Sequence, residues 1–253
     1  PTPTDCNGNN TPTGLAALAL GVNPATGKVY AGLTCTGRES GAGGAAGPRS
    51  DLRAYVYEFD PATAAFNPSP KINLSLDYDR VGSPRPQGWK TWQPYVCCAD
   101  SDQQPWLADI VFDGNDMVLG FRSRLADLVN YLSATTGGET LRACSVGTNS
   151  WQIESSGTCN GSGPTPGALN LMGLSSNVQG PGTPQGEWYW NDDGGEGEAT
   201  TGGLVQWPGR ALFTTQTDGL GRYNQVGYYA FKNTTGDVIG AANAYASFTV
   251  PQI

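Results

Sequence analysis

Six strand–turn–strand patterns recur along this chain and restrict it to a β fold more strongly than any other feature of the sequence. Short apolar or aromatic runs with a period of two alternate with turns rich in Gly, Pro, Asn and Asp, as is typical of β-hairpins. The patterns are of two types, which follow each other in the same order three times. The apolar type covers residues 15–33, 106–122 and 203–215, and the aromatic type covers residues 52–67, 141–153 and 225–239.

The turns inside these patterns contain the residues that tight reversals require. Asp113-Gly114 is the strongest hairpin signal in the chain, because Gly readily adopts the positive φ of a two-residue turn. Pro61 presets the backbone of a turn after Asp60, and Pro208-Gly209 forms another turn pair. These turns predict where the strands end.

One pattern of each type supplies about four strands, which is the size of one propeller blade. We therefore predict an all-β fold of about three four-stranded, propeller-like blades with long Gly/Pro-rich loops. A β-sandwich or jelly roll is the alternative, because short strands at regular spacing also suggest one. We expect a single all-β domain over residues 1–253, in which residues 1–14 are a Pro/Thr-rich lead-in segment. Long loops are predicted at residues 36–50, 81–104, 160–185 and 191–201.

Three blades are too few to close a ring, since propellers typically have about four to eight blades. Closure matters because it hides the unpaired edges of the sheets. We therefore expect the chain to contact other copies of itself, or neighbouring domains of a larger surface protein. The apolar segments at residues 15–22 and 244–253 are the candidate contact strands.

Composition excludes several classes of function. The chain contains no histidine, which excludes every enzyme that relies on a catalytic histidine. Its 14 basic and 22 acidic residues give a net charge of −8, so it lacks the basic footprint of a nucleic-acid-binding protein. The longest apolar stretch, at residues 15–22, is too short for a transmembrane helix, and none is expected. The chain opens at Pro1 without methionine, as a mature or internal fragment would.

The six cysteines predict disulfides, and therefore an extracellular location on the cell surface or in a secreted appendage. They are Cys6, Cys35, Cys97, Cys98, Cys144 and Cys159. Cys144 and Cys159 flank a turn-like segment and the start of a second strand, so antiparallel pairing would bring them together. Adjacent cysteines such as Cys97 and Cys98 rarely bridge each other without strain. We expect these two to reach different partners, with Cys6 and Cys35 as candidates, and no thiol to remain free.

The most unusual segment is WYWNDDGGEGE at residues 188–198. Carboxylates on a Gly-rich loop could hold Ca²⁺ through oxygen ligands, although the spacing is not that of an EF-hand and a solvated acidic loop is the simpler interpretation. The candidate calcium ligands are Asp192, Asp193, Glu196 and Glu198. Trp188 and Trp190 would share one face of a strand, where they could stack on a sugar or pack in the core. No other cofactor is expected.

Glycoside hydrolysis needs two carboxylates and no histidine, so composition leaves it open. The candidates outside the acidic segment are Asp109, Asp113, Asp116 and Glu187. Nothing in the sequence fixes two of them at catalytic spacing. Asp113 and Asp116 are better explained as turn formers whose side chains bond their own backbone. We therefore expect a protein that is not an enzyme.

Four Asn-x-Ser/Thr sequons are candidate N-glycosylation sites. They are Asn9, Asn73, Asn160 and Asn233. Asn160 and Asn233 fall on predicted turns, where a glycan can be accommodated. This number of sequons is close to what a composition rich in Ser, Thr and Asn produces by itself.

Several segments resemble one region of large secreted bacterial surface proteins that contain Sdr-type B-like repeats. The segments are VYAGLTC at 29–35, DLRAYVYEFDP at 51–61, PWLADIVFDGNDMVLGFRSR at 105–124, LRAC at 141–144 and GGLVQWPG at 202–209. They occur in the same order and cover most of residues 15–240. The resemblance implies a non-enzymatic, propeller-like head, and it implies no catalytic residues.

These observations favour a structural or adhesive module of an extracellular cell-surface protein or filament. The alternative is a carbohydrate-binding module or glycoside hydrolase that uses the aromatic–acidic loop at 188–198. Other copies of the chain or neighbouring domains are the expected partners, with glycans as further candidates. Nucleic acid is not expected, because the chain is acidic.

Overall fold

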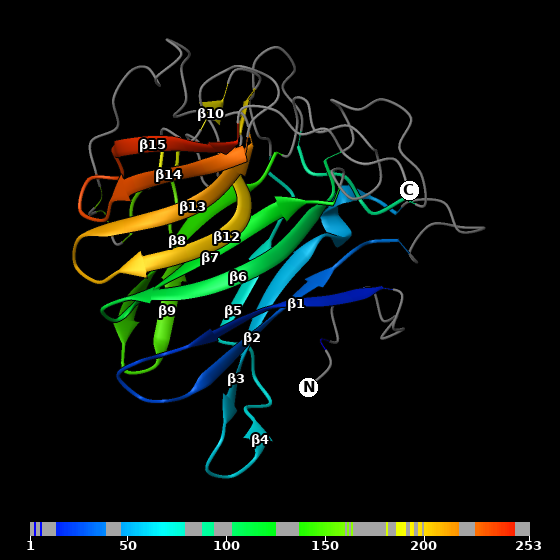
Figure 1. The fold of residues 1–253 in the computed structure, drawn as a ribbon. Helices are drawn as coiled ribbons and strands as arrows, with labels where there is room; N and C mark the ends of the chain where they lie inside the picture. Colours follow the sequence, from blue (N-terminus) through cyan, green and yellow to red (C-terminus); the bar gives the residue numbers. More distant parts are fainter. Residues whose placement is uncertain are drawn as a thin grey trace.

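The computed structural model of the chain is all-β, and its strands form separate antiparallel sheets (Figure 1). The structure describes residues 3, 6, 14–38, 47–78, 88–93, 103–124, 137–159, 161, 163, 181, 186–190, 193–194, 197–198, 200–217 and 226–245. Within these residues there are three sheets of four or five strands, none of which closes into a barrel, and one two-stranded ribbon.

Each large sheet is built from strands that follow one another in the chain (Figure 1). The first sheet contains β1 (Leu15–Val22), β2 (Val29–Cys35), β3 (Arg53–Asp60), β4 (Ala65–Phe66) and β5 (Ile72–Ser75), and both β4 and β5 pair with β3. The second contains β6 (Pro105–Asp113), β7 (Asp116–Ser123), β8 (Glu139–Gly147) and β9 (Ser150–Ile153). The third contains β12 (Thr200–Trp207), β13 (Ala211–Thr217), β14 (Val226–Lys232) and β15 (Val238–Tyr245). The ribbon pairs β10 (Asp193–Gly194) with β11 (Gly197–Glu198), and a short 3₁₀ helix, η2 (Arg49–Asp51), precedes β3.

The predicted grouping of hairpins into four-stranded units is confirmed, because each unit forms one sheet. The Asp113-Gly114 signal is also confirmed: Gly114 has a φ of 61°, and Asp113 pairs with Asp116 across the turn. Pro208-Gly209 likewise joins β12 to β13. Local turn chemistry therefore sets these strand boundaries.

The first strand of every large sheet contains a register irregularity. It lies between Ala17 and Leu20 in β1, between Leu107 and Asp109 in β6, and between Thr200 and Leu204 in β12. Bulges of this kind bend an edge strand and increase its twist. The three sheets thus repeat one structural unit, including the register irregularity in its first strand. We call these first strands, β1, β6 and β12, the leading strands.

The second sheet packs between the first and the third, and this explains why the centre of β7 is apolar at five consecutive positions, 117–121. Met117, Leu119 and Phe121 belong to the core shared with the first sheet, whereas Val118 belongs to the core shared with the third. Successive side chains on a strand point to opposite faces, so a strand with two buried faces needs no polar alternation. This explains the continuous apolar run MVLGF.

The sheets approach each other closely where glycine replaces a side chain. A Cβ at Gly120 in β7 would lie 2.3 Å from the carbonyl oxygen of Gly202 in β12, and one at Gly21 in β1 would lie 2.4 Å from that of Ile110 in β6. Both neighbours are backbone atoms, which cannot rotate away. These glycines therefore set the spacing between the layers.

Separate stacked sheets fit a sandwich-like arrangement as well as a row of blades. The structure therefore confirms the all-β prediction and the four-stranded units, but it does not confirm the propeller. That the whole chain is one domain stays a prediction.

We predict that Gly120→Ala destabilises the fold by about 1–3 kcal/mol, because the new methyl group forces β7 away from β12. The control is Gly240→Ala in β15, since Gly240 has no atom within 4 Å of its Cβ position. Urea unfolding of the two variants checks this. Equal stabilities would show that the glycine contact does not set the layer spacing.

Candidate functional site

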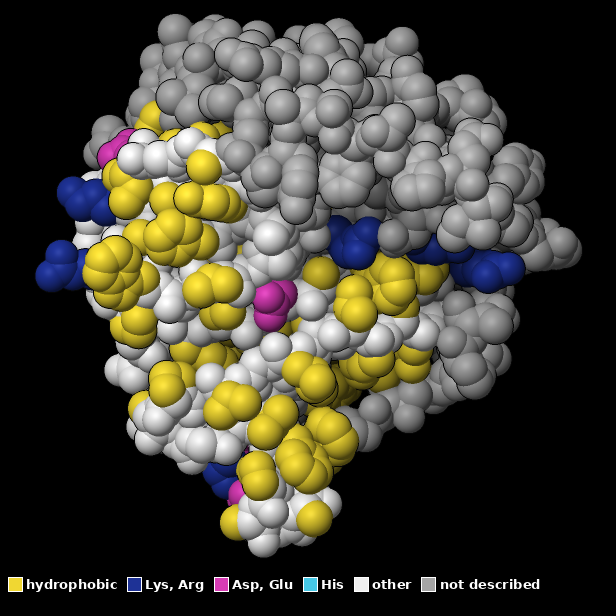
Figure 2. Space-filling model, in the orientation of Figure 1, with side chains coloured by type: hydrophobic (Ala, Val, Ile, Leu, Met, Phe, Trp, Pro, Cys, Tyr) yellow, Lys and Arg dark blue, Asp and Glu magenta, His cyan; other side chains and the backbone are white. Residues whose placement is uncertain are grey.

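An apolar groove opens on the face where the leading strands of the three sheets meet. It has a volume of about 570 Å³ and is lined by Leu20, Gly21, Val22, Pro24, Val29, Ile110, Val111, Phe112, Leu204, Val205, Gln206 and Pro208. Leu20 and Val205 are each 66% exposed, and Val22 is 58% exposed. Figure 2 shows hydrophobic side chains gathered over β1, β6 and β12 on this face. Such a patch is typical of an interaction surface.

Hydrogen bonds between sheets hold the walls of the groove in place. The backbone N–H of Leu107 in β6 donates to the hydroxyl of Thr34 in β2, at 3.0 Å. The N–H of Leu204 in β12 donates to the carboxylate of Asp109 in β6, at 2.8 Å. Both donors belong to edge strands and are satisfied by side chains of a neighbouring sheet, as buried N–H groups require. Sequence reasoning noted residues 15–22 as apolar, but it did not find the contribution of β12.

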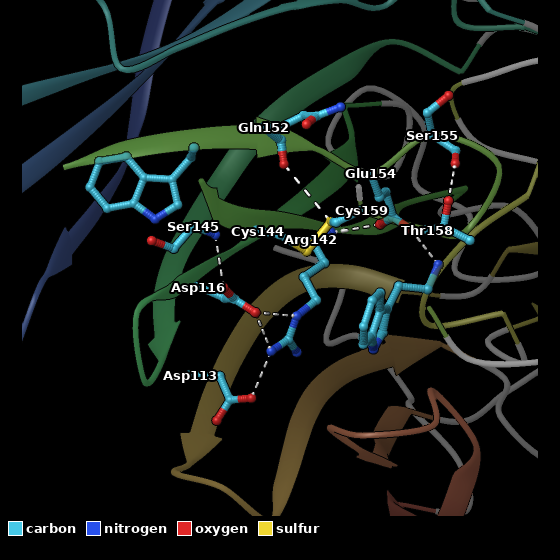
Figure 3. Close-up of a disulfide and its surroundings, with 12 residues drawn as sticks. Asp113, Asp116, Arg142, Cys144, Ser145, Gln152, Glu154, Ser155, Thr158 and Cys159 are labelled. Carbon is cyan, nitrogen blue, oxygen red and sulfur yellow. Dashed lines mark hydrogen bonds and ion pairs between the residues drawn. A yellow bond between two sulfur atoms is a disulfide. The ribbon is translucent and has the colours of Figure 1, made fainter. Parts of the chain in front are cut away.

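The Arg142 cluster lies at the end of β6, at the start of β7 and on β8 (Figure 3), and Arg142 also donates to the carbonyl of Asn233 in the β14–β15 turn of the third sheet. The guanidinium of Arg142, on β8, forms ion pairs with Asp113 at 2.9 Å and Asp116 at 2.7 Å. It also donates to the hydroxyl of Tyr189 at 2.9 Å and lies over the ring of Trp188, 4.7 Å from its centroid. Burial by itself would lower the pKa of Arg142, but Tyr189 and the two carboxylates outweigh it and raise that pKa.

Asp113 and Asp116 are therefore more than turn formers. The expectation that their side chains bond their own backbone is wrong, because both carboxylates bond residues of other segments, in β8 and in the β12–β13 turn. Asp113 also accepts a hydrogen bond from the backbone N–H of Gly209 at 2.9 Å, and Asp116 accepts one from the N–H of Ser145 at 2.8 Å. These contacts use both carboxylates as structural groups.

Glu154 is a buried acid next to this cluster (Figure 3). Its carboxyl group accepts hydrogen bonds from the backbone N–H of Arg142 at 2.6 Å and from that of Trp188. Burial raises the pKa of Glu154 to about 8, although these two hydrogen bonds act in the opposite direction. Glu154 is therefore largely protonated at neutral pH. Burial likewise raises the pKa of Tyr189.

Residues 188–189 form a turn, so Trp188 and Trp190 do not lie on one face of a strand. Tyr189 and Trp190 are buried, and the indole N–H groups of Trp188 and Trp190 donate to backbone carbonyls of Asn233 at 3.0 Å and Thr235 at 3.4 Å. Both tryptophans thus contact the β14–β15 turn. Of the two alternatives for them, packing inside the protein is the one that the structure shows. Their use as a sugar platform stays a prediction.

The calcium candidates fall on or beside the β10–β11 ribbon, whose register places Asp193 opposite Glu198. Asp192 and Glu196 lie outside the described residues, as do the side chains of Asp193 and Glu198. Calcium binding by this segment stays a prediction.

The structure joins Cys144 to Cys159, as predicted, with their Cα atoms 5.9 Å apart (Figure 3). It also joins Cys6 to Cys35, with Cα atoms 5.6 Å apart. The expectation that Cys6 and Cys35 pair with Cys97 and Cys98 is therefore wrong. The strand pair β1–β2 places Leu15 opposite Cys35, and the carbonyl of Gly14 accepts a hydrogen bond from the N–H of Thr36 at 2.9 Å. Cys97 and Cys98 lie outside the described residues.

Two of the four sequons can be placed. Asn73 in β5 is exposed, and its amide oxygen accepts hydrogen bonds from Arg53 at 2.6 and 2.9 Å. Asn233 is only 2% exposed, so a glycan there would require its side chain to turn outward. Asn9 and Asn160 lie outside the described residues.

Comparison with known proteins gives a different set of relatives from the one expected. No family model matches the chain. Three proteins of Dictyostelium discoideum are similar to it: Colossin-A is 36% identical over 195 residues (72% of this chain), Colossin-B 33% over 173 residues (64%) and Colossin-D 32% over 124 residues (46%). The chain covers only 2% of Colossin-A, 4% of Colossin-B and 12% of Colossin-D. The predicted relationship to bacterial surface proteins with Sdr-type repeats is therefore wrong, since the homologues are Dictyostelium colossins.

The protonated state of Glu154 predicts that stability falls as pH rises. The folded state holds this proton up to about pH 8, whereas the unfolded chain releases it near the ordinary pKa of 4.5. The stabilisation that comes from this proton is therefore complete below the pKa of Glu154 in the unfolded chain. It is lost as pH rises through the pKa in the folded state, where the free energy of unfolding falls by up to about 1.4 kcal/mol per pH unit. Urea unfolding between about pH 5 and pH 9 should show this decline, and Glu154→Gln should remove it.

Asp60→Asn is the control for that experiment. A hydrogen bond from Lys28 lowers the pKa of Asp60, so its stabilising effect is lost only at acidic pH, below the tested window. The variant should therefore keep the wild-type slope. If the free energy of unfolding changes with pH in the same way in the wild type and in Glu154→Gln, the raised pKa of Glu154 is contradicted.

We also predict that the unreduced protein has no reactive thiol. With Cys6–Cys35 and Cys144–Cys159 formed, this requires Cys97 and Cys98 to bond to each other or to another molecule. Thiol titration in denaturant and peptide mapping test the prediction. Two reactive thiols would contradict it, and six would contradict the extracellular location.

Proposed function

We propose that this chain is a non-enzymatic structural module of an extracellular protein, and that it assembles through the apolar groove. The occupant we infer is a second copy of the chain. The observation that carries this proposal is the exposure of Leu20, Val22 and Val205 on one continuous face. Side chains of this size stabilise an interface when they are removed from water.

The way the three sheets already pack supports a second copy as the occupant. The main contacts between sheets all involve a leading strand: β1 packs on β6, and β12 packs on both β6 and β7 (Figure 1). The apolar groove is continuous with these contacts and offers the same kind of surface. A similar sheet from another copy would therefore meet a complementary face.

A blade-like organisation is part of the same proposal. The repeated four-stranded units and their bulged leading strands are what successive propeller blades would share. Association of copies through the leading strands would cover apolar surface that three units leave exposed. If the rotation between copies does not close a ring, contacts of this type would lead to adhesion or to a filament.

The two disulfides support the extracellular location, because disulfides persist mainly in oxidising compartments. Within the described part of the chain, no helix is long and apolar enough to cross a membrane. The similarity to colossins, of which this chain covers a small part, fits a module of a larger protein.

Sedimentation of the purified chain tests the proposal. We expect a dimer or larger species, and Leu20→Lys or Val205→Lys should weaken association by about ten- to a hundredfold, because each removes one buried aliphatic side chain from the contact. Ile239→Lys is the matched control, since Ile239 is 59% exposed on β15 and does not line the groove. A monomer at all concentrations, or equal effects of all three changes, would contradict the proposal.

A further inference from the structure

A polar hollow, here called the turn pocket, lies where turns of the first and second sheets meet. It has a volume of about 440 Å³, and its lining includes Asn23, Thr26, Asn115, Thr148, Asn149 and Trp151. The β1–β2 turn supplies the first two residues, the β6–β7 turn supplies Asn115, and the β8–β9 hairpin supplies the rest. Ligand pockets usually measure about 300–1,000 Å³, so this one is large enough for a small ligand.

One amide of the turn pocket is held in place by buried groups of the first sheet. The Asn149 side-chain oxygen accepts a hydrogen bond from the hydroxyl of Tyr30 at 2.9 Å, and its amide nitrogen donates to the carboxylate of Glu58. Tyr30 is 1% exposed and Glu58 is 9% exposed. Asn149 also has a φ of 56°, a conformation that few residues other than glycine adopt. The pocket wall is therefore fixed before any ligand arrives.

The aromatic wall of the pocket is also fixed. Trp151 is half-buried, and its indole N–H donates to the backbone carbonyl of Asn115 at 2.7 Å. Its ring meets Tyr30 at 82°, with centroids 5.6 Å apart. The same indole lines a neighbouring hollow of about 400 Å³ beside β5. Trp151 therefore belongs to the lining of both hollows.

Several polar groups of the turn pocket have no partner among the described residues. The side chains of Asn115 and Thr148 make no hydrogen bond there, and Asn23 uses only its oxygen, which accepts from the N–H of Ala25 at 2.9 Å. Amide and hydroxyl groups can both donate and accept hydrogen bonds. These groups belong to the same lining as the indole of Trp151.

The chemistry of the lining selects the class of ligand. None of the described residues that line the turn pocket is charged, so nothing there pairs with a phosphate or carboxylate. An apolar ligand would leave the amides unsatisfied, which costs free energy. A sugar ring offers hydroxyls to the amides and a C–H face to the indole. We propose that the turn pocket binds a neutral saccharide.

This site is distinct from the apolar groove and from the aromatic–acidic segment at 188–198. The experiment is a titration of the full chain with neutral oligosaccharides of glucose, galactose, mannose, xylose and N-acetylglucosamine, with anionic glycans for comparison. Calorimetry and tryptophan fluorescence report binding. We expect a neutral oligosaccharide to bind, and Asn115→Ala and Thr148→Ala each to weaken it about five- to tenfold, as expected for the loss of one hydrogen bond.

Trp151→Ala should abolish binding, and Trp151→Phe should retain part of it, because the phenyl ring still stacks. Asn115 and Thr148 are exposed, so their variants should keep the wild-type melting temperature. Trp207→Ala is the matched control: Trp207 is 56% exposed on β12, outside the pocket, and its loss should not affect binding.

Three results would overturn the inference: no binding of any neutral oligosaccharide, a preference for anionic glycans, or wild-type affinity in both Asn115→Ala and Thr148→Ala. Leu20→Lys separates this site from the proposed assembly. It should leave saccharide binding unchanged, whether or not it changes sedimentation.

Discussion

The buried guanidinium of Arg142 ties the second sheet to the 186–190 segment and to the β14–β15 turn of the third sheet, where it donates to the carbonyl of Asn233. Arg142 binds the β6–β7 turn through ion pairs with Asp113 and Asp116. It contacts the 186–190 segment through Tyr189 and Trp188. A buried charge is tolerated only when it is paired and hydrogen-bonded, and removing one partner from such a pair typically costs about 3–5 kcal/mol. The cluster therefore requires all of these segments to be in place together.

The sequence predicts the local part of this fold because turns and strand periodicity are local properties. Asp113-Gly114 and Pro208-Gly209 identify their hairpins without any knowledge of the tertiary structure. The even number of cysteines and the turn between Cys144 and Cys159 identify that disulfide for the same reason. The Cys6–Cys35 bridge was not predicted because its two cysteines are 29 residues apart and no local turn pattern links them.

The stacking of the sheets and the buried acids could not be predicted in this way. Glu58, Glu139 and Glu154 are all at most 9% exposed, although glutamate is rarely buried unless it is paired. Their partners come from distant segments: Tyr30 and Asn149 for Glu58, Tyr78 for Glu139, and the N–H of Trp188 for Glu154. The turn pocket has the same origin, since its residues come from three turns that only tertiary packing brings together. No short-range pattern marks such a set.

The β1–β2 turn connects the two surfaces on which the proposed activities rest. Val22 and Pro24 line the apolar groove, whereas Asn23 and Ala25 line the turn pocket, so consecutive residues serve different surfaces. The turn is held by its own hydrogen bonds: the N–H of Asn23 donates to Lys28 at 3.0 Å, and the N–H of Gly27 donates to Asn23 at 2.8 Å. A copy that covers Val22 and Pro24 therefore does not need to displace Asn23. The proposed assembly through one surface and the proposed recognition through the other are therefore compatible in the same chain.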